Sequence, residues 1–187
     1  MTTDVRILTI GHSSHPLGSF IWLLRQHRVE ALVDIRRFPG SRRHPHFSRE
    51  NLAVTLADED MEYHWLEALG GRRHRRNDDP PSPNPGLRNQ SFRTYADYMA
   101  TDEFKQGISV LLDLAGNRRT AIMCAEALFW QCHRRLVSDH LMANGVTVQH
   151  IFPGGEVKPH TLTQGAKILD GTVTYPGQPT LFDMAGE

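Results

Sequence analysis

The sequence predicts an α/β protein of three layers, in which helices cover both faces of a mostly parallel sheet. Short apolar runs alternate along the chain with segments whose apolar residues recur at helical spacing. Such alternation is typical of strand–helix–strand units, whose two strands are parallel. The length of 187 residues fits one domain with a sizeable core.

Each element follows from a local pattern. Val5 to Ile10 is a short apolar run, and Pro16 suits the first turn of the helix that follows it. Ser48 and Thr101 are good N-caps, and Gly145 is suited to close a helix. In chain order the predicted elements are a strand at 5–10, a helix from 16, strands at 31–35 and 61–66 around a helix at 51–60, helices at 92–99 and 104–114, a strand at 120–124, a helix at 132–144 and a strand at 146–151.

The predicted elements define one α/β domain over residues 1–152. Within it, residues 70–90 have no hydrophobic period and form a predicted mobile loop. Residues 153–187 are rich in Gly and Pro and are interpreted as a C-terminal extension.

Composition narrows the class of protein. The hydrophobic fraction of 39% and charged fraction of 22% suit a globular domain, and no apolar run is long enough to span a bilayer. The N-terminus lacks the layout of a secretory signal, and a secreted scaffold would carry more than two cysteines. We therefore expect a cytoplasmic protein with no membrane partner. The net charge of zero provides no global basic field, so any anion site must be local.

Polar residues follow three of the predicted strands. Ligands of open α/β sheets bind outside the carboxyl ends of the strands. The segments at these ends are Gly11-His12-Ser13, Asp34-Ile35-Arg36 and Cys124-Ala125-Glu126, and Cys132-His133-Arg134 opens the next predicted helix. Topology predicts that these four segments converge.

An ordered set of motifs identifies a family resemblance. The motifs are T-I-G-H-S at 9–13, L-V-D-I-R at 32–36, P-x-S-R at 39–42, L-G-G at 69–71, F-R-T-Y-A-D-Y-M at 92–99, M-C-A-E at 123–126 and C-H-R at 132–134. Together they resemble the domain-of-unknown-function family numbered 488, from about Ile7 to Ile151. The resemblance implies the fold and the location of the site, and it leaves the reaction and any cofactor unknown.

Cys124 and Cys132 are candidate nucleophiles. His133 is then the candidate base, and Glu126 the candidate acid or orienting group. The opposing interpretation is structural, because cysteine is commonly a small buried apolar residue and Glu126 with Arg134 could form a buried ion pair. Cys124, Cys132, His133 and His12 are also soft metal ligands, but their spacing lacks the paired C-x-x-C of structural zinc sites, so the sequence predicts no metal.

Arginine and helix N-termini point to an anionic ligand. Guanidinium groups bind phosphate and carboxylate in a planar, bidentate manner. The candidate anion-binding residues are His12, Ser13, Arg36, Arg42 and Arg134, whereas the arginines at 72–76 are interpreted as a solvated loop. A nucleotide or nucleic acid is the predicted ligand class.

The end of the chain carries a short peptide motif. Residues 178–182, Q-P-T-L-F, resemble the Q-x-x-L-F peptide by which bacterial replication and repair proteins bind the sliding clamp. Leu181 and Phe182 would enter an apolar pocket of the clamp, and Gln178 would add an orienting hydrogen bond. The opposing interpretation packs Leu181 and Phe182 on their own domain.

Three functions remain open from sequence alone. The first is a DNA-associated enzyme, active in repair and recruited by the sliding clamp. The second is a non-catalytic module that binds a nucleotide or nucleic acid, and the third is a small-molecule enzyme unrelated to DNA. An unaffected phenotype or activity after Cys124→Ser and Glu126→Gln would favour the binding module.

Overall fold

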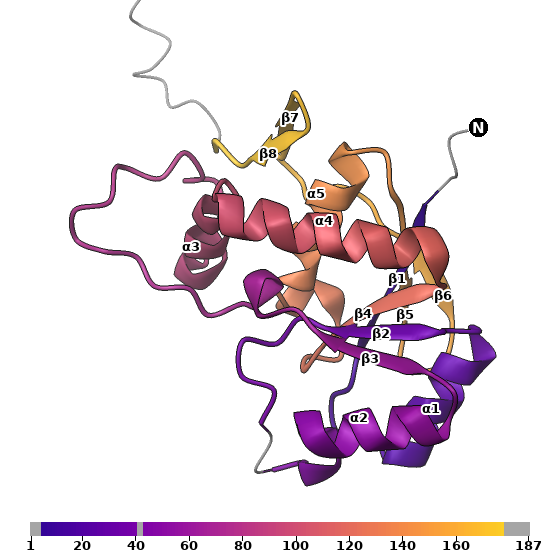
Figure 1. Cartoon of the computed structure of the whole chain (residues 1–187). Coiled ribbons are helices and arrows are strands. Elements are labelled where there is room, and N and C mark those ends of the chain that lie inside the picture. The colour runs from indigo at the N-terminus through magenta and orange to yellow at the C-terminus, as the bar shows by residue number, and fades with distance from the viewer. Residues whose placement is uncertain (1–4, 41–42, 178–187) are drawn as a thin grey trace, which may run out of the picture.

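A computed structural model describes residues 5–40 and 43–177 (Figure 1). Its main sheet has the strand order β3-β2-β4-β1-β5-β6, with β6 antiparallel to β5 and the other pairs parallel. A separate hairpin joins β7 to β8. The strands are β1 (Arg6–Gly11), β2 (Ala31–Asp34), β3 (Glu62–Trp65), β4 (Thr120–Cys124), β5 (Thr147–Ile151), β6 (Val157–Pro159), β7 (Lys167–Leu169) and β8 (Thr172–Thr174).

Helices cover both faces of the main sheet, as the sequence predicts. The helices α1 and α2 lie below the sheet in Figure 1, and α4 and α5 lie above it. The α-helices are α1 (Leu17–Gln26), α2 (Arg49–Asp58), α3 (Gln90–Tyr98), α4 (Asp102–Asn117) and α5 (Arg134–Ala143). The three-layer α/β fold is therefore confirmed, and each predicted boundary falls within a few residues of the observed one.

The main sheet separates two hydrophobic cores, one on each face. Leu8 and Leu32 both pair with Ala121, and these three side chains pack with α1 and α2. On the opposite face Val33 and Ile122 belong to the core formed with α3, α4 and α5. The central strands are buried on both faces, which explains their continuous apolar sequence.

Residues after 153 form three further strands and contribute side chains to the core. The sequence pattern does not predict β6, β7 and β8, because each of these strands has only three residues. Val173 and Tyr175 are buried in the core on the α5 side. Between Gly70 and Asn89 the structure has no helix or strand, as expected for a loop.

A buried hydrogen-bond chain ties the C-terminal segment to the sheet. His150 on β5 lies 2.7 Å from the Thr9 hydroxyl and 2.9 Å from His160. Asp139 on α5 accepts from His160 at 2.9 Å and from the Tyr175 hydroxyl at 2.7 Å. Burial, with His160 nearby, lowers the pKa of His150 to about 3. His150 is thus neutral near pH 7. The hydrogen-bond chain is a structural element of the fold.

Within residues 5–40 and 43–177, none of the helices has the length and apolar character that a bilayer-spanning segment requires.

Candidate functional site

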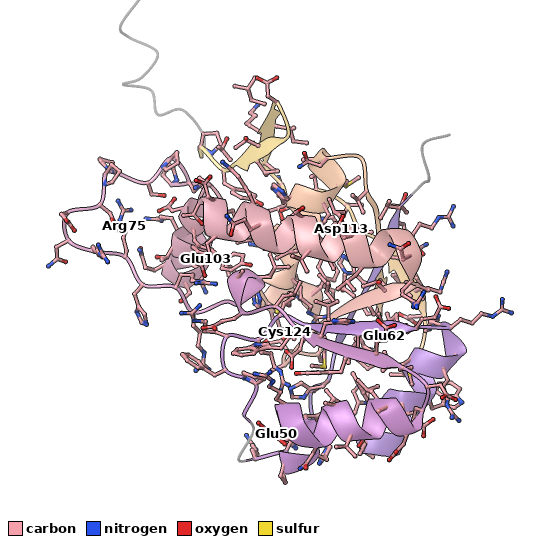
Figure 2. All side chains as sticks on the ribbon, viewed as in Figure 1. Glu50, Glu62, Arg75, Glu103, Asp113 and Cys124 are labelled. Carbon is pink, nitrogen blue, oxygen red and sulfur yellow. The ribbon has the colours of Figure 1, made fainter. Side chains whose placement is uncertain are left out.

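The carboxyl ends of β1, β2 and β4 meet as topology predicts. The backbone N–H of His12 donates to the carbonyl of Cys124, and the N–H of Ile35 donates to the carbonyl of Met123. In Figure 2, Cys124 lies near the middle of the molecule, whereas Glu50 and Arg75 lie at its periphery. The three strand ends and the start of α5 therefore form one buried centre.

Two cysteines and one histidine form the core of this centre. The Nδ1 atom of His133 lies 3.8 Å from the sulfur of Cys124 and 3.6 Å from the sulfur of Cys132. All three residues are buried. Both cysteines are free thiols. The segment before α5 contains a short 3-10 turn, Phe129–Gln131, which returns Cys132 towards the end of β4.

The surroundings of Cys132 favour its anionic form. The backbone N–H of Arg134 donates to the Cys132 sulfur at 3.4 Å, at the start of α5. Burial alone would raise the pKa of Cys132, but its contacts with Cys124 and His133 and the charge of Arg134 lower it well below its usual range. Contact with Cys132 and burial raise the pKa of Cys124. Cys132 is therefore the more acidic of the two thiols.

Glu126 connects the centre to solvent. Its side chain is exposed, and its carboxylate accepts a hydrogen bond from the Cys124 thiol at 3.2 Å. Its backbone carbonyl accepts from Nη2 of Arg134 at 2.5 Å. Glu126 is thus a carboxylate that touches both the buried thiols and water, a position suited to proton transfer.

Arg134 is a buried cation held by carbonyl groups. Its side chain is 1% exposed, and Nη2 donates to the carbonyls of Glu126 and Ala127. Its Nε atom has no hydrogen-bond partner in the described part of the chain. No ion pair with a carboxylate is found for it among residues 5–40 and 43–177. Arg134 therefore supplies buried positive charge beside the cysteines.

Arg36 is engaged by its own neighbour. Its guanidinium donates to both carboxylate oxygens of Asp34 and to the carbonyl of Phe47. His12 lies 3.2 Å from Nη1 of Arg36 and donates through Nδ1 to the carbonyl of Ser13 at 2.9 Å. Burial and Arg36 lower the pKa of His12 to about 4. His12 is thus neutral, and the role of Arg36 in anion binding stays a prediction.

The other predicted anion-binding residues have different surroundings. The backbone N–H of Ser13 donates to the carbonyl of Ala125 at 2.8 Å, so that N–H is occupied. Arg42 lies outside the described residues.

Two family motifs support the centre from the side of β3. A Cβ atom on Gly71 would lie 2.9 Å from Nδ1 of His133, so a side chain there would crowd the histidine. Tyr95 on α3 donates to the carbonyl of Leu69 at 2.6 Å, and its ring contacts His133 edge-on. Tyr98 donates to the carbonyl of Ala68 at 2.7 Å. The glycine and tyrosine motifs therefore position the backbone that covers His133.

A pocket missed by sequence reasoning lies beside the start of α5. It has a volume of about 490 Å³ and is lined by Arg88, Phe92, Phe129 and Arg135, among others. The guanidinium of Arg135 lies over the ring of Phe92, 5.0 Å from its centroid, and its buried Nε has no hydrogen-bond partner within the described ranges. Phe129 is stacked on His150 with ring centroids 3.6 Å apart. The double arginine at 134–135, directly after Cys132 and His133, is the sequence signal that could have located this pocket.

Comparisons with known proteins agree with the motifs. The family model described as domain of unknown function DUF488 matches residues 16–141, which is more than half of the chain. No curated protein and no solved structure matches the chain.

Proposed function

We propose that this chain, which belongs to the DUF488 family of domains of unknown function, is an enzyme that acts on a nucleotide or a nucleic acid. The pocket of Arg88, Phe92, Phe129 and Arg135 is the observation that carries the proposal. Its volume is within the range of small-molecule sites. Two arginines and two aromatic rings are the groups that bind phosphates and stack on bases.

The catalytic groups in this proposal are Cys124, Glu126, Cys132 and His133. Arg135, which lines the pocket at the start of α5, lies three positions after Cys132 in the chain. Arg134 adds buried positive charge beside the thiols and would favour an anionic ligand. Glu126, the exposed member of the cluster, is the group best placed to exchange protons with a bound ligand.

Arg135→Ala is expected to weaken nucleotide binding about 10- to 100-fold, because a hydrogen bond to a charged group contributes roughly 1.5–3 kcal/mol. The measurement is fluorescence anisotropy of a labelled oligothymidine, with adenosine monophosphate as competitor. Arg25→Ala is the matched control, since it removes the same charge from a largely exposed side chain of α1. Equal affinity of the Arg135 variant and the wild type, or no binding by either, would refute the proposal that this pocket binds a nucleotide.

Mass spectrometry of the incubated nucleotide then separates an enzyme from a non-catalytic module. A change in mass that Glu126→Gln abolishes supports the enzyme. Binding without any change in mass supports the module.

We also propose that residues Gln178, Leu181 and Phe182 bind the bacterial sliding clamp. These residues lie outside the described part of the chain, so the sequence motif is the support. We expect a Kd of roughly micromolar, because a short peptide loses ordering entropy when it binds. The double variant Leu181→Ala/Phe182→Ala should show no binding in calorimetry and an unchanged unfolding transition, because the two anchors supply most of the contact. A wild-type protein that produces no heat with purified clamp would remove this link to DNA.

A further inference from the structure

The two sulfurs and the His133 nitrogen lie close enough together to bind one metal ion. The three atoms all lie within 4.8 Å of one another. The two sulfur–nitrogen distances are 3.8 and 3.6 Å. A zinc ion with ordinary Zn–S and Zn–N bond lengths and tetrahedral angles requires sulfur–nitrogen separations of about 3.6 Å. The His133 nitrogen is therefore at a suitable distance from each sulfur to share one ion with it.

The tautomer of His133 is the one that a metal ligand requires. Its Nε2 atom lies 2.9 Å from the carbonyl oxygen of Ile35. A carbonyl oxygen only accepts hydrogen bonds, so Nε2 carries the hydrogen and Nδ1 of the neutral ring presents its lone pair to the two sulfurs. A hydrogen bond of this kind from the second ring nitrogen is the usual support of metal-binding histidines. Ile35 thus orients the ring for coordination.

Glu126 lies next to these three residues. The carboxylate of Glu126 approaches the Cys124 sulfur at 3.2 Å and its side chain is exposed, whereas Cys124, Cys132 and His133 are buried. Three protein ligands with one open position towards solvent is the arrangement of catalytic zinc sites. Closed structural sites use four protein ligands.

We infer that Cys124, Cys132 and His133 bind one Zn²⁺ ion and leave its fourth position to water beside Glu126. Two thiolates and an imidazole are ligands that suit zinc. Binding releases the remaining thiol protons to solvent, and two thiolates balance the charge of the ion. The spacing of the two cysteines hides the site from a search for C-x-x-C, because a strand end and a helix start bring the ligands together.

The inference deepens the proposed function and rests on it only for the assignment of these residues to the reactive centre. In the zinc form, Cys124, Cys132 and His133 are ligands, and Glu126 remains as the acid–base group next to the ion. When bound, the ion would supply Lewis-acid chemistry at the strand ends, beside Glu126.

The test uses the full chain purified under reducing conditions and freed of metal by a chelator. Titration with Co²⁺ should produce thiolate-to-cobalt charge-transfer absorption and the strong visible bands of a tetrahedral site, at one ion per chain. Zn²⁺ should displace the cobalt and protect both thiols from iodoacetamide. A protein that shows no charge-transfer band, or whose thiols react equally with and without Zn²⁺, overturns the inference.

Variants identify the ligands. Cys124→Ser, Cys132→Ser and His133→Gln should each weaken Zn²⁺ binding by more than about 100-fold, which exceeds the loss typical of outer partners of a metal site. Glu126→Gln should retain binding, and circular dichroism should show that each variant is folded. Full zinc affinity in both cysteine variants would overturn the assignment.

Metal titration needs no nucleotide, so its outcome is separate from that of the proposed function. Zinc binding without nucleotide binding refutes only the function. Nucleotide binding to a protein that never binds zinc refutes only the inference.

Discussion

Asp34→Ala is expected to lower the free energy of unfolding by about 3–5 kcal/mol, the usual result of removing one partner from a buried ion pair. Asp34 is completely buried, and the side chain of its partner Arg36 is 6% exposed. The carboxylate accepts from the Arg36 guanidinium and from the Tyr63 hydroxyl at 2.7 Å. The variant would leave a guanidinium and a phenol without their acceptor in the interior. Urea denaturation near pH 7 measures the change.

Two further variants show whether the loss comes from the unpaired charge. Glu59→Ala removes a carboxylate from a half-exposed pair with Arg25 on the surface, and it should cost no more than about 1 kcal/mol. Asp34→Ala combined with Arg36→Met should recover part of the lost stability, because no buried charge is then left alone. A double variant that is less stable than Asp34→Ala would contradict this explanation.

Gly11→Ala is expected to destabilise the protein by about 3 kcal/mol or more, beyond the usual range for overpacking. A Cβ atom at Gly11 would collide with the backbone carbonyl of Glu126 and would lie 2.9 Å from Nη2 of Arg134. A main-chain carbonyl cannot rotate away as a flexible side chain can, so the loop after β4 would have to move. Thermal or urea unfolding gives the magnitude.

The Gly11 variant should also disturb the reactive centre. The displaced loop carries Glu126 and the carbonyls that hold Arg134, so cobalt absorption and nucleotide affinity should both fall. Gly18→Ala is the matched control, since nothing lies within 4 Å of a Cβ at this helical position. Alanine should stabilise that helix by up to about 1 kcal/mol. If Gly11→Ala is as stable as the wild type, the contact between position 11 and the Glu126 carbonyl does not require glycine.

Parts of the site were predictable because they depend on chain topology. Strands that are parallel and adjacent must end at one edge, so Gly11, Asp34 and Cys124 were expected together, and the structure brings them together. The roles of individual side chains were less predictable. Arg36 has the chemistry of an anion ligand, but the pattern alone does not reveal that Asp34, two positions earlier, holds its guanidinium.

The prediction of no metal rested on local spacing, which does not record how close distant residues come in the fold. Eight positions separate Cys124 from Cys132, which is unlike the paired pattern of structural zinc sites. The turn at Phe129–Gln131 brings the second cysteine back to the first. The pocket of Arg88 and Arg135 was hidden for a similar reason, since its walls come from a loop without periodicity, from α3, from α5 and from the segment at 161–164.

By itself, the sequence determined the three-layer α/β fold, the order of its main strands and helices, and the family. These depend on interactions between near neighbours in the chain, which leave helical or strand periodicity and capping residues in the sequence. Only the tertiary structure decided which atoms meet at the strand ends. His133 presents Nδ1 to two sulfurs because Ile35, 98 positions away in the chain, accepts from its other nitrogen. Contacts of that kind depend on how distant segments pack, and no local pattern records them.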